Sequence, residues 1–328
     1  MLGSLAGVAS AQSSVTLFGL VDVGVRQVKG AAGTVNTLSS DGRSSSRLGV
    51  RGVEDLGGGL KASFWIEAPL SADTGTSDAT RFWNRRATVS LSGAFGEVRL
   101  GRHKVAARLT VDDFDPYSTT GTGAVNAIFS GLGSKAGFPQ RVDNQVGYVL
   151  PGDLGGVYGG ADVAAGEGAA TDGNKSMSAR LGYKAGPLHV AGAFSVGGVS
   201  NNKYKFSVIA GSYDFGVAKA SLMMGQNKFD ALKQGWWQVG AVVPVGSGEV
   251  LLSYADANAN AAAEVKTAGD AKLFALGYNH ILSKRTTIYA TLSQIKNEGL
   301  AKFVVAGGNA VNAGGTSRGA DVGIRHSF

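Results

Sequence analysis

The segment that decides the fold class is Leu60-Lys-Ala-Ser-Phe-Trp-Ile-Glu67. Its aliphatic and phenylalanine side chains occupy every second position, and the positions between them hold Lys, Ser, Trp and Glu. Successive side chains of a β-strand point to opposite faces, so this alternation predicts a strand with one apolar and one mixed face. The same two-residue period recurs near both ends of the chain, in residues 15–25 and 320–328. The chain is therefore predicted to be all-β.

Two kinds of connection alternate between the periodic segments. The short, turn-like connections cover residues 55–59, 93–96, 151–156, 185–187, 214–216, 244–248 and 280–285. The longer, polar connections cover residues 27–43, 70–81, 104–140, 166–175, 197–203, 227–234, 256–269 and 297–317. Seven turns and eight loops predict sixteen strands. Short turns at one end and long loops at the other are typical of a transmembrane β-barrel of the outer membrane.

Composition excludes several other classes of protein. The 328 residues include no cysteine, so neither disulfides nor thiolate metal sites are expected. The net charge is +7, but the basic residues are scattered rather than clustered, which argues against nucleic-acid binding. The four histidines do not form the spacing of a zinc hydrolase, and no GxSxG motif occurs. We therefore expect no metal, no cofactor and no enzymatic activity.

The first eleven residues resemble the second half of a secretory signal. Ala9 and Ala11 form an A-x-A pattern, so cleavage would leave Gln12 as the first residue. No stretch of 18 apolar residues follows, which argues against a transmembrane helix. We expect residues 1–11 to be a signal-peptide remnant and residues 12–328 to form a single barrel domain. A soluble, secreted β-sandwich has the same alternation, so periodicity alone leaves that class open.

Four segments carry a resemblance to a known family. They are residues 14–22 (SVTLFGLVD), 46–62 (SRLGVRGVEDLGGGLKA), 85–102 (RRATVSLSGAFGEVRLGR) and 322–328 (VGIRHSF). These segments resemble the trimeric general diffusion porins of Gram-negative outer membranes, and most closely those of the β-proteobacteria. The resemblance implies a sixteen-stranded antiparallel barrel, a homotrimer, and a third loop, residues 104–140, folded inward to narrow the pore.

The same resemblance implies the partners of the chain. Its last residue, Phe328, is similar to the terminal signal that the barrel assembly machinery reads. The expected surroundings are outer-membrane lipid and lipopolysaccharide, and the expected solutes are small anions. The predicted location is the bacterial outer membrane.

Strand alternation and the resemblance together predict the side chains that line the pore. Alternation places Arg47 and Arg51 on the lumen face, because Leu48 and Val50 take the lipid face. By resemblance, Arg47, Arg85 and Arg141 correspond to the family's basic cluster at the constriction. Two further basic residues, Arg86 and Lys302, are expected to join them. Alternatively, each of these arginines is solvated or paired with a carboxylate.

The opposing negative charge is expected from two places. Glu67 shares the lumen face of its strand, and Asp112, Asp113 and Asp115 lie in the third loop. These aspartates are predicted to line the pore, or alternatively to hold the folded loop or bind a cation.

The predicted function is passive diffusion of small hydrophilic solutes through a weakly anion-selective pore. One alternative is a cation-selective or substrate-specific porin on the same barrel. A more distant alternative is a barrel with an adhesive or enzymatic role.

Overall fold

The computed structural model describes residues 14–134, 137–138, 140–166, 175–199, 202–266 and 269–328. The predicted signal remnant, residues 1–11, lies outside this part of the chain. The strands are β1 (Ser14–Gly30), β2 (Gly33–Ser39), β3 (Arg47–Gly57), β4 (Leu60–Pro69), β5 (Arg86–Gly93), β6 (Gly96–Lys104), β7 (Arg141–Val142), β8 (Gln145–Val149), β9 (Val157–Ala164), β10 (Lys175–Ala185), β11 (Leu188–Val199), β12 (Asn202–Asp214), β13 (Lys219–Phe229), β14 (Leu232–Val245), β15 (Gly248–Ala259), β16 (Ala271–Ile281), β17 (Thr286–Asn297) and β18 (Thr316–Ser327). The helices are α1 (Ala106–Phe114), α2 (Ala261–Lys266) and the 3-10 turn η1 (Val125–Ile128).

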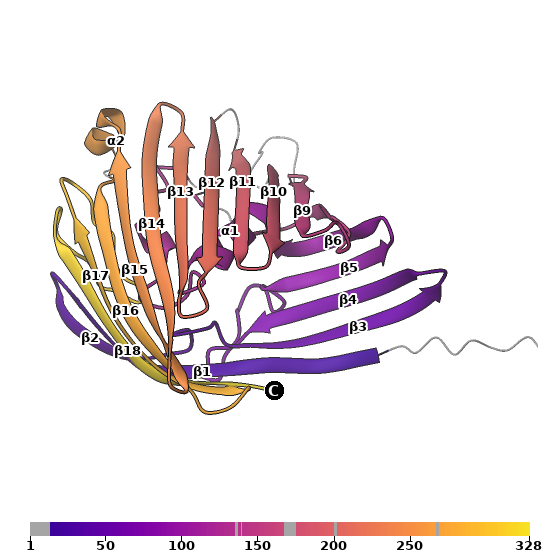
Figure 1. The fold of residues 1–328 in the computed structure, drawn as a ribbon. Coiled ribbons are helices and arrows are strands. Elements are labelled where there is room, and N and C mark those ends of the chain that lie inside the picture. Colours follow the sequence, from indigo (N-terminus) through magenta and orange to yellow (C-terminus); the bar gives the residue numbers. More distant parts are fainter. Residues whose placement is uncertain (1–13, 135–136, 139, 167–174, 200–201, 267–268) are drawn as a thin grey trace, which may run out of the picture.

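Antiparallel pairing of neighbouring strands closes the sheet into a barrel (Figure 1). The last strand, β18, pairs with β1 from Leu20 opposite Ser327 to Lys29 opposite Arg318. One half of β1 pairs with β2 and the other half with β3, so these two strands share one position in the wall. In the same way β7 and β8 both pair with β6. Among the described residues the wall therefore has sixteen positions, and the predicted sixteen-stranded barrel is confirmed.

All seven predicted turns lie between consecutive strands, but three of the predicted long loops are wrong. Residues 27–43 contain the end of β1 and all of β2, and the loops predicted at 197–203 and 227–234 fall mostly within strands. Polar composition alone does not distinguish a loop from an exposed, paired strand. In β2 nearly every side chain is exposed, so a paired ribbon that extends past the wall carries polar residues on both faces.

The outer face of the wall is apolar and exposed. Leu17, Leu181 and Ile209 point outward and are 60–65% exposed. Polar side chains such as Asp22, Gln234 and Gln238 lie on the other face and are buried. An exposed apolar belt of this extent suits contact with lipid rather than water. In the described part of the chain, no helix is long and apolar enough to cross a membrane.

The third long loop, predicted at residues 104–140, begins after β6 and folds into the lumen as predicted over its described residues 105–134. Its helix α1 packs on the inner face of the wall formed by β9 to β13 (Figure 1). The apolar side of α1 presents Val111 and Phe114, which share a buried cluster with Phe206, Met223 and Trp236 of the wall. Burying these side chains between loop and wall favours the inward position by the hydrophobic effect.

The carboxylate of Asp115 fixes the turn that follows α1. It accepts backbone N–H bonds from Tyr117, Thr119 and Val125 at 3.2, 2.9 and 3.3 Å. It also accepts a bond from the Gln238 side chain of β14 at 3.0 Å. Burial raises the pKa of Asp115 despite these hydrogen bonds. Asp115 thus joins the loop to the barrel wall.

The far end of the loop touches the opposite wall. Thr122 is fully buried, and its backbone N–H donates to Asp321 of β18 at 3.3 Å. A Cβ added at Gly319 would lie 3.0 Å from the Cβ of Thr122, so the absence of a side chain there allows the close approach. The loop therefore spans the lumen from β9–β13 to β18.

This contact predicts an engineered crosslink. Disulfide-bonded Cβ atoms lie roughly 3.8 Å apart, so a small adjustment of the loop would allow a bond in Thr122→Cys/Gly319→Cys. The natural chain has no cysteine, so thiol counting after mild oxidation reads this pair alone. We expect complete oxidation of the folded protein. The pair Thr122→Cys/Ala320→Cys, with its second cysteine on the outer face of β18, serves as control and should keep both thiols. Free thiols in the first pair would contradict the inward position of the loop.

Candidate functional site

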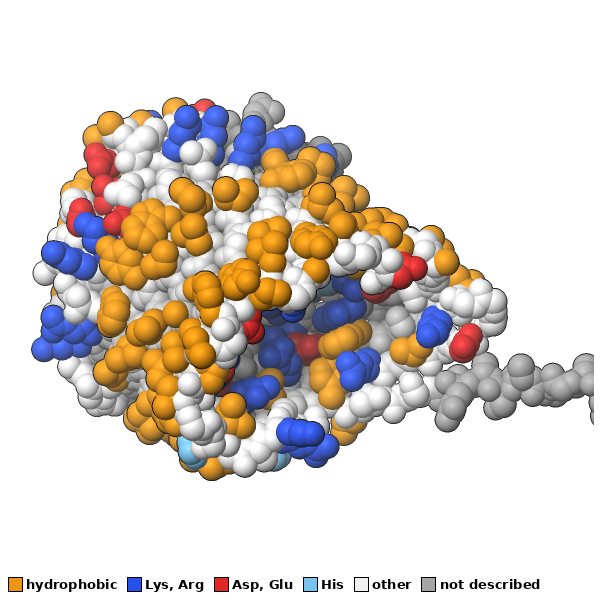
Figure 2. Space-filling view, viewed as in Figure 1, with side chains coloured by type: hydrophobic (Ala, Val, Ile, Leu, Met, Phe, Trp, Pro, Cys, Tyr) orange, Lys and Arg blue, Asp and Glu red, His pale blue; other side chains and the backbone are white. Residues whose placement is uncertain are grey.

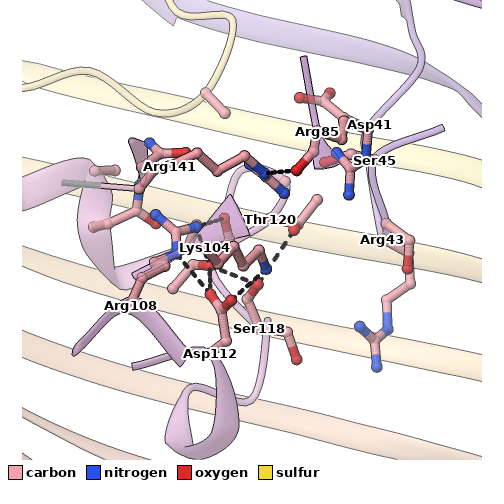
Figure 3. Close-up of a pocket in the computed structure, with 18 of the residues that line it drawn as sticks. Asp41, Arg43, Ser45, Arg85, Lys104, Arg108, Asp112, Ser118, Thr120 and Arg141 are labelled. Carbon is pink, nitrogen blue, oxygen red and sulfur yellow. Dashed lines mark hydrogen bonds and ion pairs between the residues drawn. The ribbon is translucent and has the colours of Figure 1, made fainter. Parts of the chain in front are cut away.

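Two neighbouring cavities lie inside the barrel. The larger, of about 740 Å³, is bounded by residues 41–47, by the folded loop and by residues 304–308 of the last loop (Figure 3). The smaller, of about 210 Å³, is bounded mainly by β3 to β6. Five side chains line both cavities: Arg47, Arg85, Lys104, Leu109 and Arg141. These five side chains mark the passage from one cavity to the other, and we call them the constriction.

Positive charge dominates the walls of the two cavities. The basic side chains are Arg43, Arg47, Arg85, Arg86, Arg99, Lys104, Arg108 and Arg141, and the acidic ones are Asp41, Glu67, Asp112 and Asp113. Eight cations therefore face four carboxylates in this part of the lumen. Figure 2 shows Lys and Arg side chains gathered in a hollow that opens at the end of the barrel with the short turns.

On the wall side of the constriction, one carboxylate serves two guanidinium groups. Glu67 lies 2.5 Å from the Nε of Arg85 and 3.5 Å from an Nη of Arg47. The indole N–H of Trp65 donates to the same carboxylate at 3.3 Å. Glu67 is buried and contacts both arginines, so it holds them in position. Its single negative charge balances only one of their two positive charges.

Arg141 completes this group without a carboxylate of its own. Its Nε donates to the backbone carbonyl of Arg85 at 2.7 Å (Figure 3). The short strand β7 places Arg141 opposite Lys104. No carboxylate of the described chain pairs with Arg141, so its charge remains available to a solute. The structure thus brings together the three arginines that the resemblance singled out.

The folded loop supplies the other side of the constriction. Asp112 lies 2.5 Å from the Nζ of Lys104 and 2.7 Å from the Nε of Arg108, one turn earlier in α1. The Thr119 hydroxyl also bonds to Asp112 and accepts from Arg108. Burial alone would raise the pKa of Asp112, but Arg108 and Lys104 outweigh it and hold the pKa below its usual value. Asp112 is therefore ionised at neutral pH, and again one carboxylate faces two cations.

The remaining predicted basic residues lie in different places. Arg86 lines the smaller cavity, and the guanidinium of Arg51 lies over the rings of Phe18 and Trp65. Lys302 is exposed in the last loop and lines neither cavity.

The predicted loop aspartates and the C-terminal residue are also separated from one another. Asp113 lines the larger cavity and pairs with Arg180 at 2.9 Å, although burial raises its pKa. Asp115 lies behind the loop and holds it, which is the alternative role that the sequence left open. Phe328 pairs through its backbone with Gly19 at 3.0 and 3.1 Å, and its side chain is about half exposed.

Sequence reasoning missed several cavity residues. Lys104 ends β6 and Arg108 lies in the folded loop, whose path could not be predicted, although the spacing of Arg108 and Asp112 is that of a helical ion pair. Arg99 and Glu97 share the lumen face of β6 and pair at 2.8 Å, and strand alternation would have identified both. Arg43 lies in residues 40–46, which separate β2 from β3 and show no periodic signal.

Comparison with known proteins places the chain among porins. The family described as "Gram-negative porin" matches residues 1–300. The chain is 40% identical to outer membrane porin protein 32 of Delftia acidovorans over 98% of this chain and 96% of that protein. It is 31% identical to an outer membrane porin protein of Bordetella pertussis over 100% of this chain and 98% of that protein.

Solved structures give the same placement. An anion-selective porin from Comamonas acidovorans superposes with a TM-score of 0.88 at 36% identity and covers 97% of this chain and 100% of its own. The trimer form of OmpT from Vibrio cholerae has a TM-score of 0.69 at 17% identity and covers 96% and 99% of the two chains, which shows the shared fold.

The position of Glu67 predicts the effect of neutralising it. In Glu67→Gln the two neighbouring arginines lose their shared countercharge, so the constriction becomes more positive. Two unit charges roughly 4 Å apart interact by about 1 kcal/mol in water, with opposite sign for chloride and potassium, which corresponds to a rise of up to roughly thirtyfold in the chloride-to-potassium permeability ratio. Reversal potentials across a planar bilayer with a KCl gradient measure this ratio.

A matched control is Glu54→Gln, since Glu54 is exposed near the turn that follows β3. This change should leave the ratio as it is. A lower chloride preference in Glu67→Gln would contradict the charge balance described for the constriction.

Proposed function

The chain belongs to the Gram-negative porin family, and from this premise we propose that its pore favours small anions over cations. As a member of this family it is an outer-membrane protein that allows passive diffusion, and it is not an enzyme. Selectivity is the part of the function that depends on this chain's own side chains.

The observation that carries the proposal is the ratio of charges at the constriction. On both the wall side and the loop side, one carboxylate contacts two cations, and Arg141 adds a cation with a backbone partner. A guanidinium group does not lose its proton at physiological pH, so this excess persists. The walls of a barrel have a low dielectric constant and concentrate the field in the aqueous lumen. An anion is therefore attracted and a cation repelled at the constriction.

The same arrangement explains how an anion can leave again. Arg47, Arg85 and Arg141 lie within one group, so an anion can exchange one guanidinium for the next as it moves. Glu67 already occupies part of the hydrogen-bonding capacity of Arg47 and Arg85, and Asp112 does the same for Lys104 and Arg108. Their competition keeps the binding of a solute weak, which conduction requires.

The aspartates that could favour cations are themselves paired with basic residues. Asp41 lies 3.0 Å from Arg26, and Asp113 lies 2.9 Å from Arg180. Arg26 is shared between Asp41 and the buried Asp321, but the larger cavity is still lined by more cations than carboxylates, which supports the anion-preferring pore over the cation-selective alternative. One structural relative at 36% identity carries the description "anion-selective", which agrees with this choice.

We also propose that the chain works as a homotrimer. The exposed apolar outer face supplies surface for lipid and for neighbouring copies. The OmpT structure described as a trimer is a distant relative by sequence, and its assembly is a property of that protein. Contacts with lipopolysaccharide and the reading of Phe328 by the barrel assembly machinery stay predictions.

Removal of single cations should lower the anion preference in a graded way. Arg141→Ala removes a charge that no described carboxylate pairs with, whereas Arg47→Ala removes one that shares Glu67. We therefore expect the chloride-to-potassium permeability ratio, from reversal potentials in dilute KCl, to fall more in Arg141→Ala than in Arg47→Ala. Loss of one unit charge shifts the energies of chloride and potassium by about 1 kcal/mol each in opposite directions, which predicts a fall in the ratio of up to roughly thirtyfold.

The control for these variants is Arg318→Ala, on the outer face of β18, which bonds to Gln294 of β17. It should keep the original ratio. Potassium preference in the unchanged protein would overturn the anion pore, and an absence of conductance would overturn diffusion itself.

A further inference from the structure

Trp65 lies between two arginines on the lumen face of the wall. The guanidinium carbon of Arg51 lies 5.2 Å from the centre of the Trp65 ring, and that of Arg86 lies 4.3 Å from it. Arg51 belongs to β3 and Arg86 to β5, the two strands that flank β4. Phe18 extends this aromatic surface, with its ring 5.2 Å from Trp65 and 5.3 Å from the Arg51 guanidinium.

Stacking on a ring leaves most of the hydrogen-bonding capacity of an arginine unused. The five N–H donors of a guanidinium point outward in its plane, and the attraction of its charge to a ring does not require a hydrogen bond from them. Arg86 donates one bond, from Nε to the Thr88 hydroxyl at 2.9 Å. In the described part of the chain neither Arg51 nor Arg86 forms an ion pair with a carboxylate. Arg86 therefore presents free donors to the smaller cavity, and Arg51 lies exposed on the lumen face of β3.

Arg51 is separate from the constriction, and Arg86 directly follows the constriction residue Arg85 on the side of the smaller cavity. Arg51 follows Arg47 by four residues along β3, toward the short turn, and four residues of a strand span roughly 13 Å. Arg86 lines only the smaller cavity, on the same side of the constriction. The neighbouring Arg99 donates two N–H bonds to Glu97, at 3.0 and 2.8 Å, so it has fewer free donors for an anion. An anion that has passed the constriction toward the short turns meets Arg51 and Arg86 next.

We propose that Arg51 and Arg86, positioned by Trp65, form a second anion site that takes small carboxylates in preference to chloride. The planar fork of a guanidinium matches the two oxygens of a carboxylate, which accepts two parallel N–H bonds. Chloride is spherical, so it is attracted by the positive charge but does not match the geometry of two parallel N–H groups. The site rests on the proposed anion pathway and adds a chemical preference to it.

Acetate tests this site directly. Potassium acetate replaces potassium chloride stepwise at constant total concentration, and the single-channel conductance is recorded. If acetate binds, replacing a small fraction of the chloride with acetate already lowers the conductance of the unchanged protein close to the value measured in pure potassium acetate. Without a site, the conductance changes in proportion to the acetate fraction. A proportional curve for the unchanged protein overturns the proposal.

Arg51→Lys/Arg86→Lys separates fork geometry from charge. Lysine keeps the positive charge but has neither the planar fork nor the stacking surface. We expect the acetate concentration of half effect to rise roughly tenfold, because bonds between charged groups contribute enough for such a factor. Arg318→Lys makes the same replacement on the outer face and should keep the original curve. An unchanged curve in the double variant overturns the site.

Trp65 is a positioning residue, and a pair of variants tests its role. Trp65→Leu removes the ring and should weaken acetate binding in the same direction as the lysine pair. Trp65→Phe retains an aromatic face but loses the N–H bond to Glu67, and it should preserve most of the binding. Equal losses in the two variants would show that the ring does not position the arginines and would overturn this part of the proposal.

The two proposals fail in distinguishable ways. The reversal potential of the unchanged protein in KCl tests the anion preference without acetate. Potassium preference there overturns the proposed function. Chloride preference together with a proportional acetate curve overturns the second site alone.

Discussion

The pairing of backbone amides is the constraint on which the rest of this structure depends. In hydrocarbon an unpaired N–H or C=O group has no water to bond with, so a sheet can cross only as a closed barrel. Here closure is made by β18 on β1. Closure divides the side chains of every strand between an apolar outer face and a polar lumen. It therefore creates the lumen in which Arg47, Glu67 and Arg86 meet.

A barrel of this size encloses more space than its wall side chains fill, and the folded loop occupies part of it. The loop is held at one side by apolar contacts of α1 and by Asp115, and at the other side by Thr122 against β18. These anchors bring Arg108 and Asp112 of the loop opposite the wall arginines, where Asp112 contacts Lys104 at the end of β6. The field of the passage therefore depends on the packing of a loop as well as on the strands.

Strand alternation and turn positions could be predicted from the sequence because each depends on neighbouring residues. Strand alternation placed Arg47, Arg51 and Glu67 on the lumen face, and the family resemblance added Arg85 and Arg141 to the predicted pore lining. The path of residues 105–140 could not be predicted, because it depends on Gln238 and Gly319, which are distant in the chain. Lys302 shows the same limit, since the path of its loop decides whether it reaches the lumen.

The central claim is that fixed, incompletely neutralised cations select the solute by their electrostatic field. The salt dependence of the wild-type reversal potential tests it most directly, with the same KCl concentration ratio applied at low and at high mean salt. The Debye length shortens from about 10 Å near 0.1 M to about 3 Å near 1 M. The account predicts a clear chloride preference at low salt that falls strongly at high salt. A preference that does not change with salt, or a preference for potassium, would contradict it.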